Sequence, residues 1–385
     1  MKINMLEPAK GNADCQLELE EAALRVLRSG QFILGEEVVK FEKQCEEYLG
    51  VKHAIGVSSG TDALLMALMA HNIERGDEVI CPSFTFFATA GSISRTGAQP
   101  VFVDVYKDCF TIDTELLEKA ITPRTKAIIP VHLFGQSANM IEIMRIAEKH
   151  NLIVIEDAAQ AIGSKFEDKM VGTIGDVGCF SFFPSKNLGG FGDAGLVTTQ
   201  SDELALKLKS IRNHGMTEQY RHETIGGNFR IDALQAALLS VKLSHLNTQE
   251  ALRIEHANHY GDILIKSNVA SFDDKDNVLY TLPADLKRGL HVYNQYTIKV
   301  SNGHRDALKA FLHENGIGSA VYYPIPLHEQ ECFKPLQDTE LFPVSNSLKA
   351  ECLSIPIASE VTLANIMEIE YKLIEFADTV SKTGE

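Results

Sequence analysis

Short, continuously apolar segments alternate with helical patterns along the first half of this chain. These segments lack the polar–apolar alternation of a strand with one solvated face, and such strands are typical of a parallel sheet covered by helices on both faces. We therefore expect an α/β fold with a large, mostly parallel sheet flanked by helices. The expected strands are HAIGV (53–57), EVICP (78–82), VFVDV (101–105), KAIIPV (126–131), LIVIED (152–157), CFSFF (179–183) and GLVTT (195–199).

Helical patterns separate these apolar segments. The clearest covers 139–150, because Ile143, Ile146 and Ala147 recur at the i, i+3, i+4 spacing of a buried helix face. The other helices that we expect in this part of the chain lie at 61–72, at 84–97 and from about 233 onward.

The pattern changes after about residue 250, where strands and helices no longer alternate regularly. This mixture is typical of an α+β unit. We therefore predict a large domain over 1–250 and a small C-terminal domain over 251–385. In the small domain we expect strands at 296–300 and 319–323, and helices near 305–316 and 364–378.

Charge and cysteine content exclude several classes of protein. The formal net charge is −16, so the chain has no general basic surface for nucleic acid, although a local phosphate pocket remains compatible with it. Its seven cysteines form no C-x-x-C pair, which is typical of a reducing compartment and argues against a zinc site. No apolar segment approaches the roughly 20 residues that span a bilayer, and the first residues, MKINMLEPAK, lack a signal core. We expect a cytoplasmic protein that binds neither membranes nor metals.

Lys186 stands between an aromatic run and a glycine-rich turn, in CFSFFPSKNLGGFGDAG (179–195). A free lysine is a poor nucleophile at neutral pH because its pKa is about 10.4. Desolvation beside Phe182 and Phe183 would lower this pKa, and Schiff-base formation with an aldehyde would remove the charge. The alternative interpretation is a lysine at a strand end whose amine extends into solvent.

Two further motifs follow expected strands. In SSGTDAL (58–64), small residues precede a helix, whose free N–H groups and dipole favour an anion such as a phosphate. The alternative there is an ordinary capped helix. In VIEDAAQ (154–160), Asp157 ends an apolar strand and needs a cation or several donors, such as a protonated ring nitrogen. The alternative is a helix N-cap.

Together, these motifs predict a site for pyridoxal 5′-phosphate (PLP), because ligands of open α/β sheets bind at the carboxyl ends of strands. The cofactor needs a phosphate-binding turn, a carboxylate for its pyridinium and a lysine for its aldehyde. Phe86, at the start of an expected helix, could stack on the ring, and Ser181 could add a hydroxyl to the phosphate site. GGFGDAG lies between two strands instead of opening a helix, so the glycine fingerprint of a nicotinamide enzyme is missing.

The chain resembles the DegT-like family of sugar-nucleotide aminotransferases, which are PLP-dependent enzymes of fold type I. The resemblance extends over nearly the whole chain. The motifs that carry it are VSSGTDAL, CPSFTFFATA, VHLFGQSANM, VIEDAAQAIGS, SFFPSKNLGGFGDAG, GGNFRIDALQAA and VYYPIPLHEQ.

The resemblance implies a role for individual residues toward the cofactor. Lys186 is the catalytic residue that forms the Schiff base. Asp157 pairs with the pyridine nitrogen, Gln160 contacts the 3-oxygen of the ring and Phe86 stacks on it. The phosphate is implied to lie against Gly60, Thr61 and Ser181, and Asn228 is implied to reach the phosphate of a neighbouring subunit in a homodimer.

The resemblance also implies a substrate site. GQFILG (30–35) resembles an N-terminal substrate loop within the large domain. Arg230 is expected near the sugar nucleotide, and Arg212 and Arg221 are nearby basic residues that serve either the nucleotide or a solvated face. The other residues expected to line the substrate cleft are Tyr322, Tyr323 and His328.

The implied reaction moves an amino group from L-glutamate to a keto-sugar nucleotide in amino-sugar biosynthesis, releasing 2-oxoglutarate. The turn GGFGDAG resembles that of relatives acting at C-3 of the sugar, so a dTDP-3-keto-6-deoxyhexose or a UDP-3-keto-N-acetylglucosamine type of substrate is expected. Three alternatives remain open: a C-4 aminotransferase, a PLP-dependent sugar dehydratase and a non-catalytic PLP-binding regulator. Lysine at 186 favours transamination, because such dehydratases often carry histidine there.

Overall fold

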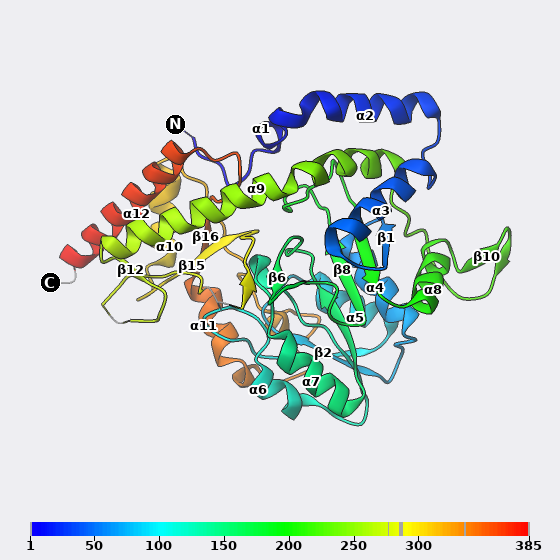
Figure 1. Ribbon diagram of the computed structural model, residues 1–385. Coiled ribbons are helices and arrows are strands. Elements are labelled where there is room, and N and C mark those ends of the chain that lie inside the picture. Colours follow the sequence, from blue (N-terminus) through cyan, green and yellow to red (C-terminus); the bar gives the residue numbers. More distant parts are fainter. Residues whose placement is uncertain (1, 276, 285–287, 335, 384–385) are drawn as a thin grey trace.

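Seven strands form the central sheet of the protein, whose computed structural model describes residues 2–275, 277–284, 288–334 and 336–383 (Figure 1). Their order is β1-β9-β8-β5-β4-β2-β3, and β9 runs antiparallel to both of its neighbours while the other pairs are parallel. Each of the seven strands expected before residue 200 overlaps an observed one, and the mostly parallel sheet is confirmed. The bounds are β1 (His53–Val57), β2 (Glu78–Pro82), β3 (Gln99–Val103), β4 (Thr125–Ile128), β5 (Ile153–Asp157), β8 (Val177–Ser181) and β9 (Gly195–Thr199).

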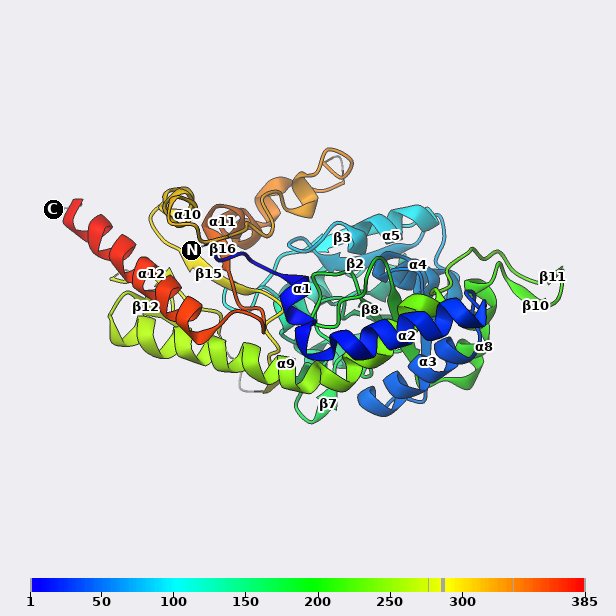
Figure 2. The same cartoon turned by 90° about the horizontal axis from the view of Figure 1, so that it is seen from above.

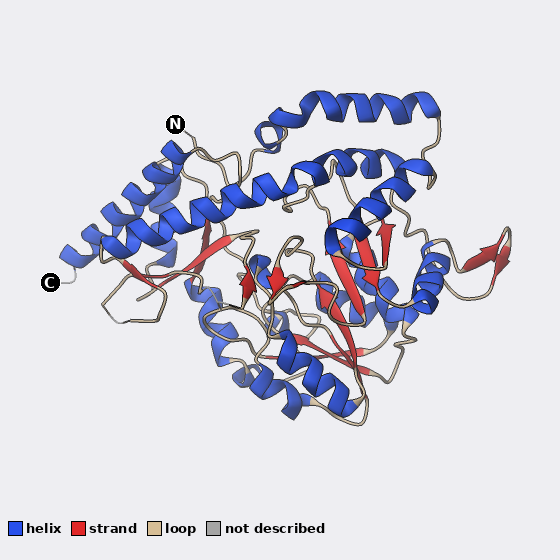
Figure 3. Ribbon diagram, in the orientation of Figure 1, coloured by secondary structure: helices blue, strands red, loops and turns tan. Residues whose placement is uncertain are grey.

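Helices cover both faces of this sheet (Figure 3). Successive residues of β5 point to opposite faces, so Val154 belongs to one buried apolar cluster and Ile155 to another. This two-sided burial explains why the strands are apolar throughout. The helices around the sheet include α3 (Glu36–Leu49), α4 (Gly60–Ala70), α5 (Ala88–Thr96), α6 (Thr114–Leu117), α7 (Met140–His150) and α8 (Asp202–Arg212).

The helix expected over 84–97 begins only at Ala88, so the placement of Phe86 at a helix start is wrong: this residue lies in the loop between β2 and α5. The start of this loop is tied to the sheet, because Ser83 N–H donates to the Val103 carbonyl at 2.8 Å. Phe84 is fully buried in a cluster with Phe134 and other apolar side chains. Burial of Phe84 therefore outweighs the helical pattern here.

The long helix α9 (Ala233–Lys266) connects the two halves of the molecule. It has 34 residues and continues well beyond the expected helical pattern near its start. Helix α2 (Gln16–Ser29) packs along its first half and α12 (Leu363–Thr383) along its second half (Figures 1 and 2). The predicted boundary between residues 250 and 251 falls inside α9, and the division into two domains remains a prediction.

A second, four-stranded sheet forms the centre of the C-terminal region, with the order β12-β13-β15-β16. Ile3 pairs with Ile317 and is buried in the same cluster, so the first residues of the chain pack on this region. The expected strand over 319–323 is reduced to one bridge between Ala320 and Ser354. The elements are β12 (Ala270–Ser271), β13 (Tyr280–Thr281), β15 (Tyr296–Val300), β16 (Cys352–Ile355), α10 (Arg305–Glu314) and α11 (Pro343–Glu351).

Smaller elements complete the described chain, and a hairpin of β10 (Met216–Glu218) and β11 (Arg221–His222) projects from the body (Figure 2). No helix in the described ranges is both long and apolar enough to cross a bilayer. The others are α1 (Pro8–Gly11), β6 (Lys165–Phe166), β7 (Lys169–Met170), β14 (Gly289–Leu290) and 3₁₀ turns at Ala13–Cys15, Glu118–Ala120, Leu133–Gly135, Leu327–Glu329 and Thr339–Leu341.

Candidate active site

The carboxyl ends of β1, β5 and β8 lie near one another at one edge of the central sheet. The first turn of α4 follows β1 directly, Asp157 ends β5 and Ser181 ends β8. Sequence motifs far apart in the chain therefore meet at the edge where ligands of open α/β sheets bind.

Helix α4 begins in a tight turn packed against Ser181. A Cβ atom on Gly60 would lie 2.6 Å from Ser181 Cβ, so only glycine fits there. Ser59 caps the helix, because its hydroxyl accepts a hydrogen bond from Asp62 N–H at 3.0 Å. Gly60 and Thr61 then present N–H groups of the kind that a helix leaves without intrahelical acceptors. Gly60, Thr61 and the Ser181 hydroxyl together suit an anion such as a phosphate.

Asp157 is a buried carboxylate, only 5% exposed, that accepts two hydrogen bonds. Thr89 Oγ1 donates to its Oδ2 at 2.8 Å, and Ala159 N–H donates to its Oδ1 at 3.2 Å. Burial raises its pKa, although these donors and the charge of Lys186 oppose the shift. A positively charged group in contact with the Asp157 carboxylate would therefore be strongly stabilised.

Lys186 lies in the loop between β8 and β9, close enough to Asp157 for their charges to interact. Desolvation lowers the pKa of its amine to about 8, while the negative charge of Asp157 opposes that decrease. The backbone turns sharply at this point, because Lys186 N–H donates to the Phe183 carbonyl at 2.8 Å. The structure thus brings together the lysine and the carboxylate that the sequence singled out.

The turn that follows Lys186 is held by α9. Gln235 Oε1 accepts a hydrogen bond from Phe191 N–H at 2.9 Å. Lys242 Nζ, which is almost completely buried, donates to the Gly189 carbonyl at 2.6 Å. Neither residue stands out in the sequence, where Gln235 and Lys242 are a polar pair seven residues apart on a mostly apolar stretch of a helix.

Gln160 connects the sheet edge to the C-terminal region. Its Oε1 accepts a hydrogen bond from Phe134 N–H at 2.7 Å, and its Nε2 donates to Tyr323 Oη at 3.0 Å. The Phe86 ring lies 6.2 Å from the Tyr323 ring and is 55% exposed, so it could cover a flat ligand. Tyr322 is half-buried beside Tyr323, with 5.9 Å between their ring centroids.

The remaining predicted site residues have different surroundings. His328 is 1% exposed, stacks on Phe342 at 4.2 Å and pairs with Asn346 at 3.1 Å, so it packs in the interior. Asn228 is exposed and its backbone pairs with that of Asn213. Arg230 Nη1 donates to Asn213 Oδ1 at 2.5 Å, while its buried Nε has no described partner. The roles of these residues toward ligands remain predictions.

The nearby basic residues Arg212 and Arg221 differ from each other. Arg212 is buried, forms an ion pair with Glu42 at 2.5 Å and donates to the Gly56 carbonyl at 3.1 Å. This buried pair explains why it lies on no solvated face. Arg221 is exposed on the projecting hairpin, 3.0 Å from Glu223.

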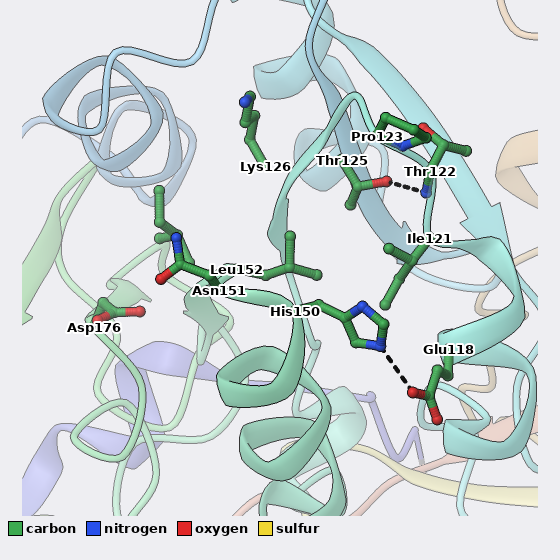
Figure 4. Close-up of a pocket in the computed structure, with 11 residues that line it drawn as sticks. Glu118, Ile121, Thr122, Pro123, Thr125, Lys126, His150, Asn151, Leu152 and Asp176 are labelled. Carbon is green, nitrogen blue, oxygen red and sulfur yellow. Dashed lines mark hydrogen bonds and ion pairs between the residues drawn. The ribbon is translucent and has the colours of Figure 1, made fainter.

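A separate cavity of about 760 Å³ lies at the opposite edge of the sheet (Figure 4). Its lining includes Thr125 and Ile153, which begin β4 and β5, and Asp176, which precedes β8. His150 and Glu118 form an ion pair there at 2.8 Å. The cavity lies at the amino end of β5, whereas Asp157 lies at the carboxyl end of that strand, so the cavity is no part of the candidate site.

The residues at the carboxyl edge fit PLP. A crowded glycine turn at a helix N-terminus suits its phosphate, a buried carboxylate with few donors suits its ring nitrogen, and an amine of lowered pKa suits its aldehyde. Lys186, Asp157, Gln160, Phe86 and the Gly60 turn would hold the group.

Comparisons with known proteins agree with this geometry. Residues 14–373 match the model of the DegT/DnrJ/EryC1/StrS aminotransferase family. A relative from Acidithiobacillus ferrooxidans, named UDP-N-acetyl-3-dehydro-alpha-D-glucosamine 3-aminotransferase, is 45% identical over 90% of each chain. A Geobacillus stearothermophilus relative, named pleiotropic regulatory protein, is 44% identical over 98% of this chain and 99% of its own.

The fold is confirmed by the same comparisons. The structure of Streptomyces venezuelae DesV in complex with a ketimine intermediate matches with a TM-score of 0.92 and 36% identity, covering 98% of each chain. The resemblance inferred from the motifs is thereby confirmed, and the chain belongs to the DegT/DnrJ/EryC1/StrS aminotransferase family.

Proposed function

We propose that this chain is a PLP-dependent aminotransferase that moves an amino group from L-glutamate to the C-3 carbonyl of a keto-sugar nucleotide for amino-sugar biosynthesis. The observation that carries the proposal is the electrostatic interaction between the amine of Lys186, whose pKa is lowered, and the buried carboxylate of Asp157, at the sheet edge that also holds the α4 turn. The name of the 45% identical relative supports a 3-keto substrate of the UDP-N-acetylglucosamine type.

Lys186 is the proposed Schiff-base residue and the proton carrier. When bound, PLP supplies an aldehyde for Schiff-base formation and a protonated ring that accepts carbanion charge. With PLP bound, Lys186 Nζ would hold the aldehyde, and as a free amine it would be placed to take up and return the proton that amino transfer moves from the substrate Cα. A pKa of about 8 leaves part of this amine neutral near physiological pH, as a base requires.

Asp157 and Gln160 orient the ring. The Asp157 carboxylate would keep the ring nitrogen of bound PLP protonated. Its place at the end of β5 fixes the direction in which the carboxylate points. Gln160 uses its oxygen for Phe134 N–H, so its amide nitrogen is left for Tyr323 Oη and the 3-oxygen of the ring. Tyr323 thereby joins the substrate side of the site to the cofactor side.

The phosphate site is proposed to need a second subunit. Gly60, Thr61 and Ser181 supply donors from one chain, and the exposed amide of Asn228 is free to reach the corresponding site of a second copy. We therefore propose a homodimer with shared active sites, in which Arg230 and Tyr322 face the sugar nucleotide. A cytoplasmic location remains part of this proposal.

A non-catalytic, PLP-binding regulator is the second candidate, because the 44% identical relative is named a pleiotropic regulatory protein. A dehydratase is less well supported, since Lys186 is present. Conversion of the bound cofactor by glutamate separates a transaminase from a regulator, because only the former consumes the amino acid.

The test is to mix the PLP-loaded enzyme with glutamate and then with 3-keto and 4-keto sugar nucleotides, and to follow products by mass spectrometry. Wild-type protein is expected to aminate a 3-keto substrate, and Lys186→Ala to lose at least roughly 10²–10⁴-fold in rate, the usual contribution of a positioned base. Lys126→Ala, at an exposed lysine on the opposite edge, is the matched control. Unchanged turnover by Lys186→Ala, or preferred amination of 4-keto substrates, would contradict the proposal.

A further inference from the structure

Thr89, which no sequence motif singles out, touches the carboxylate on which the proposed cofactor chemistry depends. We infer that Thr89 is a positioning residue: its hydroxyl holds Asp157 in the orientation and charge state needed to pair with the ring nitrogen of PLP. The inference rests on the proposed function and concerns how that site is kept active.

Thr89 is fully buried in the first turn of α5, and its Oγ1 lies 2.8 Å from Asp157 Oδ2. Ala159 N–H donates to the other oxygen, Oδ1, at 3.2 Å. Two donors on different oxygens fix the plane of the carboxylate and the direction of its remaining lone pairs. The N-terminal end of α5 adds a partial positive charge on the same side.

Several other titratable groups lie near Asp157, and the cation Lys186 among them lowers its pKa. They are Lys186, His132, Tyr323 and the thiols of Cys81 and Cys179. His132 is held in place on both ring nitrogens, because its Nδ1 accepts a hydrogen bond from Ala138 N–H at 3.1 Å and its Nε2 pairs with Glu156 at 2.9 Å. Burial raises the pKa of both thiols, which therefore stay protonated.

The charge state of Asp157 therefore depends on its hydrogen-bond donors. Burial already raises its pKa, and the hydrogen bond from Thr89 is the largest effect acting in the opposite direction. A hydrogen bond to a charged group contributes more than one between neutral groups. Removing the hydroxyl would favour the protonated acid, and a protonated Asp157 no longer stabilises a protonated ring nitrogen.

The test uses the PLP-loaded enzyme and the variants Thr89→Val, which keeps the side-chain shape, and Thr89→Ser, which keeps the hydroxyl. Thr297→Val is the matched control, because Thr297 is equally buried and pairs with Ser354 at 2.8 Å in the C-terminal sheet. The readouts are the ¹⁵N chemical shift of labelled PLP ring nitrogen, the cofactor dissociation constant and the rate of the glutamate half-reaction.

Thr89→Val is expected to move the ring-nitrogen shift toward the unprotonated form, and to weaken cofactor binding and slow the half-reaction roughly 10- to 100-fold each, as loss of a charged hydrogen bond predicts. Thr89→Ser and Thr297→Val are expected to keep the wild-type shift, even if Thr297→Val unfolds at lower temperature. If Thr89→Val does not load cofactor, the smaller Thr89→Ala variant carries the same expectation.

A wild-type ring-nitrogen shift in the loaded Thr89→Val or Thr89→Ala enzyme would overturn the inference, as would a Thr89→Ser enzyme that behaves like Thr89→Val. This result differs from failure of the proposed function. If wild-type protein itself binds no PLP through Lys186, the function is wrong; if it does and the valine variant is unaffected, only the role of Thr89 is wrong.

Discussion

Glu156 and Asp157 are consecutive residues of β5, yet their carboxylates have opposite surroundings. The side chain of Glu156 is fully buried beneath one face of the sheet and accepts four hydrogen bonds. Asp157 points to the other face and accepts two. The donors to Glu156 are the N–H groups of Gly172 at 2.7 Å, Ile174 at 2.7 Å and Gly175 at 2.6 Å, and His132 Nε2 at 2.9 Å.

The difference separates an architectural acid from a functional one. The lone pairs of Glu156 are filled, so it holds the loop over 172–175 against the sheet and has no capacity for a ligand. Asp104 is similar, because it accepts hydrogen bonds from Val344 N–H and from Ser345 at the start of α11. Asp157 keeps unused lone pairs beside an amine of lowered pKa, which is a pattern typical of active sites.

The largest expected effect comes from Asp157→Asn. The amide can still accept from Thr89, but it no longer places a negative charge before the ring nitrogen. The rate of amino transfer is expected to fall roughly 10²–10³-fold, as when one electrostatic contact to a transition state is lost. Thermal unfolding of the cofactor-free protein is expected to change little, because a costly buried charge is removed. Turnover within tenfold of wild type would show that amino transfer does not need the negative charge of Asp157.

Glu156→Gln is expected to have the converse effect. Its amide nitrogen would confront N–H donors, leaving buried groups without acceptors, so the free energy of unfolding is expected to fall by about 3 kcal/mol. Urea unfolding measures this change, with Glu142→Gln as control, because Glu142 is exposed and pairs with Arg145 only on the surface. The rate of amino transfer per folded molecule should stay near that of the wild-type protein. An unchanged unfolding free energy would show that the four contacts of Glu156 contribute little.

The sequence predicts the central sheet well because each strand is buried on both faces, and continuous apolar runs record that burial. It fails where tertiary contacts override a local pattern. Phe86 lies in a loop because buried Phe84 keeps the chain before α5 non-helical. The segment over 319–323 has strand composition, yet it forms a single bridge. Tyr323 contacts Phe84 and Phe86 instead of a neighbouring strand, and Tyr322 lies beside Tyr323.

The core of the site was predictable for a similar reason. Asp157, Lys186 and the Gly60 turn follow strand ends, and topology alone brings strand ends together. Thr89 and Lys242 were not predictable, because each acts through one contact that depends on how a helix is rotated against the sheet or the loop. Burial of His328 likewise depends on its stacking with Phe342, a residue outside the motif VYYPIPLHEQ that contains His328.

The smallest expected effect concerns the pH at which Lys186 becomes reactive. Burial lowers the pKa of its amine to about 8 from the ordinary lysine value, and only the neutral amine attacks an aldehyde. In the cofactor-free protein, the rate of Schiff-base formation with added PLP should therefore fall about tenfold per pH unit below pH 8 and level off above it. Visible absorbance in stopped-flow mixing measures the rate, and a simple alkylamine corrects for titration of PLP itself.

Asp157 and Glu156 should differ in their effect on the midpoint of this pH dependence, the pH at which half of the Lys186 amine is neutral. The negative charge of Asp157 raises the pKa of Lys186, so Asp157→Asn is expected to move the midpoint to lower pH, because the protonated amine loses its counter-charge. The side chain of Glu156 points to the other face of β5, away from Lys186, and is held there by its own donors, so Glu156→Gln should leave the midpoint in place. Equal shifts in both variants would mean that the two faces of β5 are electrically coupled, and that filled lone pairs do not isolate an architectural carboxylate from the site beside it.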